Sequence, residues 1–192
     1  MEKRFFEIRA DKKEDGPTTL KGYAAVFDSL SGDLGGFREK IQQGAFSEAI
    51  KTSDVRALYN HNSDMLPLGR TPETLRLFED EKGLGVEIDL PDTQFAKDLQ
   101  KSIERGDINQ MSFGFTVSAE GEEWEEQRNG EVVRTLTKIS SLFDVSPVAY
   151  PAYPDTEVAV RSLDKFKAKK ATAKVPMNKI KLKINLNSKE EQ

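Results

Sequence analysis

Alternating apolar and polar residues over 109–117 predict a β-strand. Every second residue from Met111 to Val117 is large and apolar, the period of two that places successive side chains on opposite faces of a sheet. The apolar face is the one that a core would take, which leaves Ser112 and Gly114 on the other face. A strand serine is most often simply polar and solvent-facing, whereas Gly114 would let a substrate backbone approach closely.

Similar patterns predict the remaining elements. Alternation indicates further strands at 4–9, 18–27, 37–41, 54–61, 75–79, 84–90, 131–139 and 142–151. Apolar residues at helical spacing indicate helices over 44–50 and 93–106, the second beginning at the N-cap Thr93 and ending at Gly106. Because strands follow one another in hairpins, as the Asn129-Gly130 turn suggests, the predicted fold class is mainly β with flanking helices (α+β), with an antiparallel, barrel-like sheet.

Composition narrows the function classes. The chain has 192 residues, no cysteine and one histidine, so a disulfide framework, a thiolate zinc site and a multi-histidine metal cluster are excluded. A carboxylate-only magnesium or calcium site stays open, although the acids show no calcium-loop spacing, and no cofactor is expected. No apolar run is long enough to span a membrane, and no signal peptide is evident, so we expect a soluble, intracellular protein.

The formal net charge of −4 hides a division of the chain. Residues 165–192 hold nine lysines and two glutamates; of 29 basic and 33 acidic residues, 20 and 31 therefore fall in 1–164, a net charge of −11. An acidic body with a basic tail bears on partners more than on fold. We predict one domain over 1–162 and a flexible tail over 163–192, in which the alternating segment 180–186 could instead form a strand against a partner.

Ser112 is a candidate nucleophile. A serine needs a base to take its proton, and a neutral imidazole is the usual base near neutral pH. His61 is the sole histidine of the chain. It falls at the end of the predicted strand 54–61, where rigid scaffolds often present reactive groups. If Ser112 is catalytic, His61 must be its partner.

The imidazole in turn needs a group that holds its tautomer, commonly a carboxylate. Asp144 is one candidate, because Phe143 and Val145 point one way in an apolar strand and Asp144 points the other. Asp64, three residues after His61, is the other. Both the histidine and Asp144 also have a purely structural interpretation, as a polar strand end and as a solvated acid.

Several segments together resemble a known family, the prohead maturation proteases of tailed phages. They are GYAAVF at 22–27, GAF at 44–46, NH at 60–61, GR at 69–70, MSFGF at 111–115 and DVSPVAYPAYP at 144–154. The resemblance implies a fold like that of the herpesvirus maturation proteases. It places the family's histidine on His61, its serine on Ser112 and its acid on Asp144, where the family often has the longer glutamate. The chain has no Gly-x-Ser-x-Gly motif, so an ordinary α/β-hydrolase is not supported.

The activity implied by this resemblance is that of a serine endopeptidase working through an acyl-enzyme. Oxyanion donors would be backbone N–H groups or an arginine, with Arg70 and Arg161 as candidates. The implied substrates are the major capsid protein or the scaffold, inside the immature phage capsid in the host cytoplasm. Self-cleavage is a further expectation, a homo-oligomer is left open, and no membrane partner is expected.

Two other readings compete with the enzyme. The chain could be a virion scaffolding or decoration protein that binds capsid subunits through its lysine tail; replacing Ser112 by alanine separates this reading from the protease. Nucleic-acid binding by the lysines is permitted by phosphate electrostatics. The acidic body and the scarcity of aromatic residues among the lysines speak against it.

Overall fold

The computed structural model describes residues 8–11, 18–150, 163–168 and 170 of the chain. The chain divides into two compact units, Met1–Tyr153 and Pro154–Gln192. The second unit contains helical residues at 163–168 and 170. The boundary that we place at residue 162 stays a prediction, and the alternating segment 180–186 lies outside the described residues.

The first sheet is antiparallel and has the order β1-β2-β7-β6. Its strands are β1 (Ile8–Asp11), β2 (Thr19–Val26), β6 (Leu75–Glu79) and β7 (Gly83–Asp89). The predicted hairpin is confirmed as β6 and β7, closed by a turn in which the Asp80 carboxylate accepts hydrogen bonds from two backbone N–H groups of residues 82 and 83. The predicted strand at 4–9 lies partly outside the described residues, and β1 occupies its end.

The second sheet has the order β3-β10-β9. It consists of β3 (Arg38–Ile41), β9 (Glu122–Glu126) and β10 (Val132–Leu136). The hairpin predicted at Asn129-Gly130 joins β9 to β10, and Gly130 takes the positive φ of 84° that such a turn requires. The β3–β10 pair is parallel, which the prediction of an antiparallel sheet did not include.

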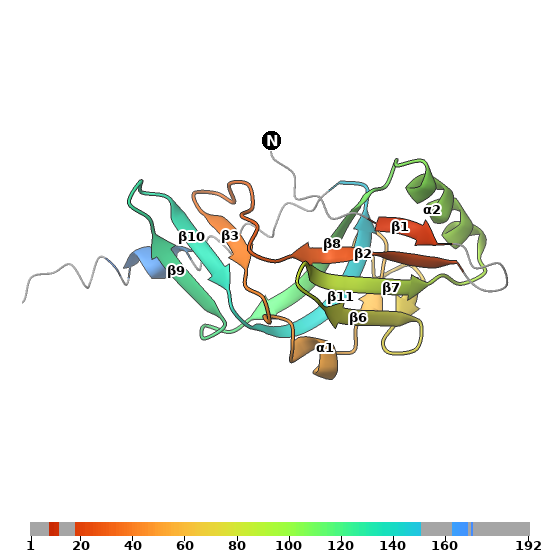
Figure 1. The fold of residues 1–192 in the computed structure, drawn as a ribbon, viewed down its shortest axis with the longest axis horizontal. Helices are drawn as coiled ribbons and strands as arrows, with labels where there is room; N and C mark the ends of the chain where they lie inside the picture. The colour runs from red at the N-terminus through yellow and green to blue at the C-terminus, as the bar shows by residue number, and fades with distance from the viewer. Residues whose placement is uncertain (1–7, 12–17, 151–162, 169, 171–192) are drawn as a thin grey trace, which may run out of the picture. The chain divides into compact units, whose positions relative to one another are not determined.

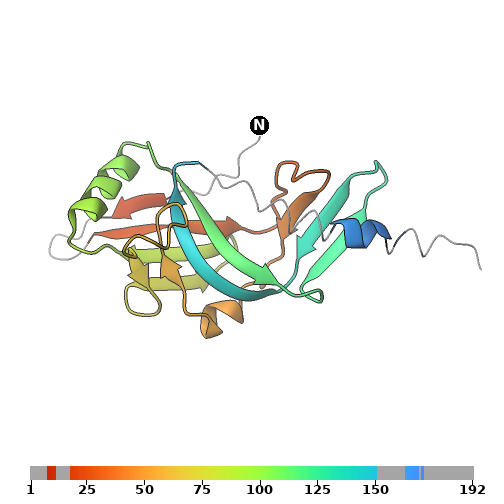
Figure 2. The same ribbon diagram turned by 180° about the vertical axis from the view of Figure 1, so that it is seen from behind.

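The third sheet has the order β5-β4-β11-β8 and carries the predicted chemistry. Its strands are β4 (Arg56–Ala57), β5 (Gly69–Arg70), β8 (Gln110–Val117) and β11 (Ile139–Val148). Figures 1 and 2 show β8 and β11 as a long, curved, antiparallel pair. The β4–β11 pair is parallel, because β4 reaches β11 by a long crossover instead of a hairpin. Among the described residues the strands thus form three sheets, without a closed barrel.

Two helices flank the sheets. Helix α2 (Gln94–Glu104) confirms the prediction: the Thr93 hydroxyl accepts a hydrogen bond from the Ala96 N–H at 3.3 Å, and Gly106 follows with a φ of 82°. Helix α1 (Ala49–Thr52) is shorter and begins later than the predicted helix over 44–50, because the preceding residues form turns. In the described part of the chain, no helix is long and apolar enough to cross a membrane.

The main core is built from the apolar faces of the sheets and of α2. Its most buried members include Leu20, Phe46, Leu84, Ile88, Leu99, Met111, Leu142 and Val145. Phe113, Phe115 and Val117 are partly buried and pack against this cluster, as the alternation of β8 predicts. One face of the β8–β11 pair is therefore fixed to the core, and the opposite face presents Ser112.

Candidate functional site

Strand register brings the predicted serine and acid to one face of the sheet. Ser112 on β8 lies opposite Ser146 on β11, and Gly114 lies opposite Asp144. Directly opposed residues of an antiparallel pair point to the same face, and so do residues two apart along a strand. The intervening Val145 is fully buried on the core side. The two serines and Asp144 therefore share the face that looks away from the core.

His61 contacts Asp144 directly. The His61 Nδ1 atom lies 2.6 Å from Asp144 Oδ1, and the two side chains are 29% and 14% exposed. The same carboxylate oxygen accepts a hydrogen bond from the Ser146 hydroxyl at 2.7 Å. The carboxylate is thus held at the edge of solvent by an imidazole and a buried hydroxyl.

The chain presents His61 from a loop instead of a strand end. Strand β4 stops at Ala57, whereas the sequence predicted a strand through residue 61. Beyond it, Leu58 N–H donates to the Val145 carbonyl and Asn60 N–H to the Pro147 carbonyl, both at 3.0 Å, so the loop follows β11 closely. The φ angles of Asn60 and His61 are 52° and 56°, a left-handed conformation that non-glycine residues seldom adopt.

Side-chain and backbone contacts hold this left-handed turn. The Asn60 Oδ1 atom accepts a hydrogen bond from Ala149 N–H at 2.9 Å, and the Ser146 hydroxyl accepts one from His61 N–H at 3.3 Å. Two consecutive residues in a costly backbone conformation persist only when their surroundings determine them. Here the surroundings are the last residues of β11, which turn the imidazole back over the sheet.

Gly114 makes room for the acid. A Cβ atom built on Gly114 would lie 2.3 Å from Asp144 Oδ2, a distance that real Cβ atoms do not show. The open space that the sequence assigned to an approaching substrate backbone is therefore occupied by the Asp144 carboxylate. Glycine at this position lets the carboxylate lie flat across the strand pair, with one oxygen toward His61 and the other over β8.

The strand around Asp144 departs from simple alternation. The pairing of β11 with β8 shifts between Leu142 and Asp144, so Phe143 has no partner of its own in the ladder. Phe143 is 53% exposed, while Val145 is buried. The prediction that these two residues share a face is wrong, because the irregularity inserts one residue. Asp144 nevertheless points away from the core, as predicted.

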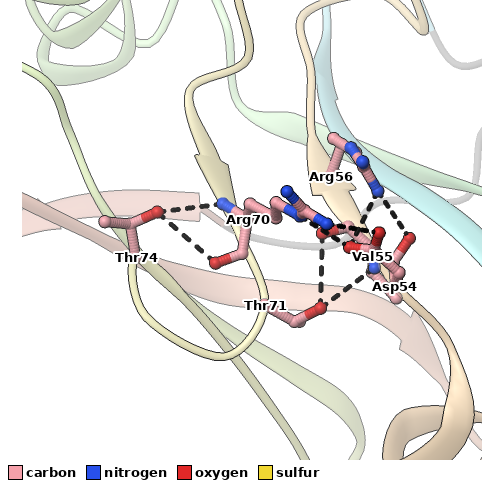
Figure 3. Close-up of polar contacts among 6 residues, drawn as sticks. All are labelled: Asp54, Val55, Arg56, Arg70, Thr71 and Thr74. Atoms are coloured by element: carbon pink, nitrogen blue, oxygen red, sulfur yellow. Dashed lines mark hydrogen bonds and ion pairs between the residues drawn. The ribbon is translucent and has the colours of Figure 1, made fainter.

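The other candidates of the sequence lie elsewhere. The rival acid Asp64 is exposed, and its backbone N–H donates to the Asn62 side chain at 2.9 Å. Arg70, an oxyanion candidate, forms a two-pronged ion pair with Asp54 at 2.8 Å and 2.7 Å (Figure 3). Arg161 lies outside the described residues. Within those residues, no group of three His, Cys, Asp or Glu side chains is arranged to hold a metal ion.

Asp54, Arg56 and Arg70 form a charged cluster on the strands next to the one that carries Asp144. The register pairs Asp144 with Arg56 on β4, and Arg56 with Arg70 on β5. Asp54 binds both guanidinium groups (Figure 3), and the hydrogen bonds from Arg70 and then Arg56 lower the pKa of its carboxyl to about 2. The two arginines are thus engaged by an acid of their own, at the exposed edge of the site.

Sequence reasoning missed Ser146 and assigned the space at Gly114 to the substrate instead of to Asp144. Ser146 could have been found from the period of two, because it is two residues beyond Asp144 and so shares a face with that candidate. The left-handed turn at Asn60 carries a weaker signal, since asparagine is among the few residues that tolerate it. The arrangement as a whole is an imidazole held by Asp144, whose sheet face also bears the half-buried Ser112; these are the residue types that a serine hydrolase uses.

A strand-borne serine with a histidine and an acid defines a class of hydrolases, and comparison with known proteins identifies the family. Residues 5–170 match the family described as caudovirus prohead serine protease. The chain belongs to this family, which confirms the resemblance seen in the sequence. It is similar to the prohead protease of Enterobacteria phage HK97, with 31% identity over 149 residues, 76% of this chain. The matched region spans 61% of that relative. No solved structure matches the chain.

Proposed function

We propose that the chain is a serine endopeptidase in which Ser112 is the nucleophile, His61 the general base and Asp144 the group that orients His61. The observation that carries the proposal is the 2.6 Å contact between His61 Nδ1 and Asp144 Oδ1 on the sheet face that also bears Ser112. Family membership supports the same assignment. A contact of this kind in a chain with a single histidine leaves one candidate base for one candidate nucleophile.

In the proposed reaction, Ser112 Oγ attacks the carbonyl carbon of the scissile peptide bond and His61 Nε2 takes the hydroxyl proton. The tetrahedral intermediate collapses when the imidazolium gives that proton to the leaving amine, which leaves an acyl-enzyme. Water, deprotonated by His61 in turn, releases the acid and restores the serine. Asp144 accepts the hydrogen bond from Nδ1–H throughout and stabilises the imidazolium.

The developing oxyanion needs donors, which usually supply the largest catalytic effect. We assign this role to backbone N–H groups in preference to Arg70, because the Arg70 guanidinium is committed to Asp54. Moving Arg70 to the oxyanion would break a two-pronged pair and leave the Asp54 carboxylate with Arg56 alone. Arg161 stays a prediction.

The proposed substrates are the major capsid protein or the scaffold of the phage that encodes the chain, cleaved inside the immature capsid. Self-cleavage is part of the proposal, with the lysine-rich segment after residue 162 as the expendable part. The support for this proposal is the positive charge of the segment, because a basic segment on an acidic body can bind other acidic protein surfaces. A tail that stays intact in mature particles would contradict self-removal.

The expected likeness to the herpesvirus maturation proteases belongs to this proposal as well. Its support is the location of Ser112 within strand β8, away from any strand-to-helix elbow. The third sheet, in which β11 pairs parallel with β4 and antiparallel with β8, is compatible with a mainly β fold that is wrapped by helices. A solved structure of the chain superposed on such a protease would test the likeness.

The test of the proposed function is co-expression of the full chain with the capsid protein of its own phage. Wild-type protein should shorten the capsid protein, and Ser112→Ala should abolish cleavage by a factor of roughly 10⁴ or more while particles still assemble. Ser118→Ala is the matched control, because Ser118 is an exposed serine that follows the same strand. A fluorophosphonate probe should label the wild type and the control but not Ser112→Ala.

Unchanged maturation with Ser112→Ala would instead favour the scaffolding or decoration protein. Labelling of Ser112→Ala to the wild-type level would also overturn the assignment of the nucleophile. In either case the His61–Asp144 contact would need a different explanation.

A further inference from the structure

Ser146 stands out among the groups that the proposed reaction does not use. Its side chain is completely buried, yet it lies on the face that presents Ser112 and Asp144, directly opposite Ser112 in the strand register. Buried hydroxyls are usually satisfied by the nearest carbonyl of their own chain. The Ser146 hydroxyl makes neither of its two contacts with a carbonyl; both join it to the candidate site.

The direction of these two hydrogen bonds can be deduced. A backbone N–H can only donate, so Ser146 Oγ must accept the bond from His61 N–H at 3.3 Å. The hydroxyl proton is then free for Asp144 Oδ1, which lies 2.7 Å away. One side chain thus holds the main chain of His61 and the carboxylate that binds the His61 ring.

The same oxygen of Asp144 also faces His61 Nδ1 at 2.6 Å. An ionised carboxylate can only accept, which assigns the ring proton to Nδ1 and leaves the Nε2 lone pair unprotonated. The second oxygen, Oδ2, has the space above Gly114. Rotation of the carboxylate would break the contacts of Oδ1 with the hydroxyl and with the imidazole together, so Ser146 limits the rotation that would release the histidine.

We propose that Ser146 is a positioning residue that locks the rotamer of Asp144 and the left-handed turn of His61, and so fixes the tautomer and direction of the imidazole. This inference rests on the proposed function for its kinetic consequence. Its structural part, the state of the His61 ring, stands independently of whether the chain cleaves peptides.

Other charged groups around Asp144 do not replace this contact. From β4, Arg56 faces Asp144 in the register, but its guanidinium lies 2.8 Å from Asp54 Oδ1. From β8, Gly114 contributes no side chain. Among the described residues, the hydrogen bonds of the Asp144 carboxylate are therefore those with the imidazole and the Ser146 hydroxyl. Removing the Ser146 hydroxyl should therefore change the orientation of the imidazole.

The experiment uses the fact that His61 is the sole histidine of the chain. Full-length protein labelled with ¹⁵N-histidine, in a Ser112→Ala background to prevent autolysis, gives one imidazole to follow by NMR. The parent should show the Nδ1–H tautomer. Adding Ser146→Ala should produce a mixture of tautomers, because the Asp144 carboxylate is then free to rotate away from Nδ1.

Kinetics with Ser112 restored provide the second readout. Ser146→Ala should lower kcat about 10- to 100-fold, the effect of one hydrogen bond to a charged group, with KM nearly unchanged. Ser146→Cys, a weak donor of similar size, should fall between the two. Ser140→Ala, an exposed serine on the same strand, is the control and should match the wild type.

The outcomes separate the claims. A tautomer and a kcat unchanged by Ser146→Ala, with only a lower melting temperature, would overturn the positioning role. If the wild-type protein cleaves no capsid protein, while Ser146→Ala still changes the ring in the Ser112→Ala background as predicted, the proposed function is overturned and the inference stands. If Ser146→Ala does not fold, Ser146→Cys alone decides, since it keeps the volume of the side chain.

Discussion

Asp144 on β11 and Asp54, two residues before the paired residue Arg56 of β4, have surroundings that differ in kind. Asp54 is 50% exposed and is held by two guanidinium groups, whose hydrogen bonds lower the pKa of its carboxyl to about 2. Asp144 is 14% exposed and is held by an imidazole and a neutral hydroxyl. A carboxylate whose charge is already balanced by arginines would stabilise an imidazolium only weakly. Among the described residues, Asp144 is bound by no guanidinium group and can stabilise the charged histidine.

The two carboxylates also differ in how strongly water screens their interactions. Ion pairs between exposed groups are screened and contribute little to stability. A carboxylate near the interior interacts more strongly with each neighbour, because the local dielectric constant is lower. We therefore expect changes at Asp144 to appear in catalysis, and changes at Asp54 to appear weakly, in stability near neutral pH.

The largest effect should follow Asp144→Asn. An amide at this position can donate to Nδ1 and stabilise the wrong tautomer, so kcat should fall by roughly 10³- to 10⁴-fold with the fold preserved. Cleavage of capsid protein measures the loss, and circular dichroism checks the fold. Asp64→Asn is the control for the rival acid and should keep wild-type activity; a loss there with activity retained by Asp144→Asn would reverse the assignment.

A smaller effect should follow Gly114→Ala. The added Cβ would lie 2.3 Å from Asp144 Oδ2, so the carboxylate must move and carry the imidazole with it. A displacement on the order of 1 Å at a catalytic group costs about 10²-fold in rate. Gly106→Ala is the control: it meets no atom within 4 Å but is strained by its positive φ, so it should lower the melting temperature and leave kcat unchanged.

The smallest effect should follow Asp54→Asn. Activity should stay within about twofold of the wild type. The folded carboxyl has a pKa of about 2, below the unfolded value near 3.8, so its ion pairs stabilise the fold above about pH 4 and lose this effect as the pH falls toward 2. Melting temperatures of the two proteins should therefore differ slightly at pH 6 and converge at pH 2. A difference that grows on acidification would contradict this sign.

Much of the site could be predicted because β-strands obey a period of two. The pattern from Met111 to Val117 gave the face of Ser112, and the apolar neighbours of Asp144 suggested an outward acid. The single histidine removed any choice of base. Local rules of this kind hold wherever one face of a strand is fixed to a core.

Long-range pairing could not be predicted in the same way. The parallel contact between β4 and β11 joins residues more than 80 positions apart, and it replaces the expected end of the strand at 54–61 with a loop along β11. The irregularity at Phe143 inserts one residue and exposes an aromatic side chain that alternation assigned to the core side. Such features depend on which segments pair in the folded chain, and the composition of the chain does not specify this pairing.

The origin of the site in a late strand has a consequence for when the protein can act. A growing chain that has emerged only as far as residue 140 already contains His61 and Ser112, but it lacks the acid, the buried hydroxyl and the carbonyls that hold the histidine turn. Incomplete polypeptides would therefore carry both reacting groups without the means to align them. Synthesis itself would delay the onset of cleavage until β11 has joined its neighbours.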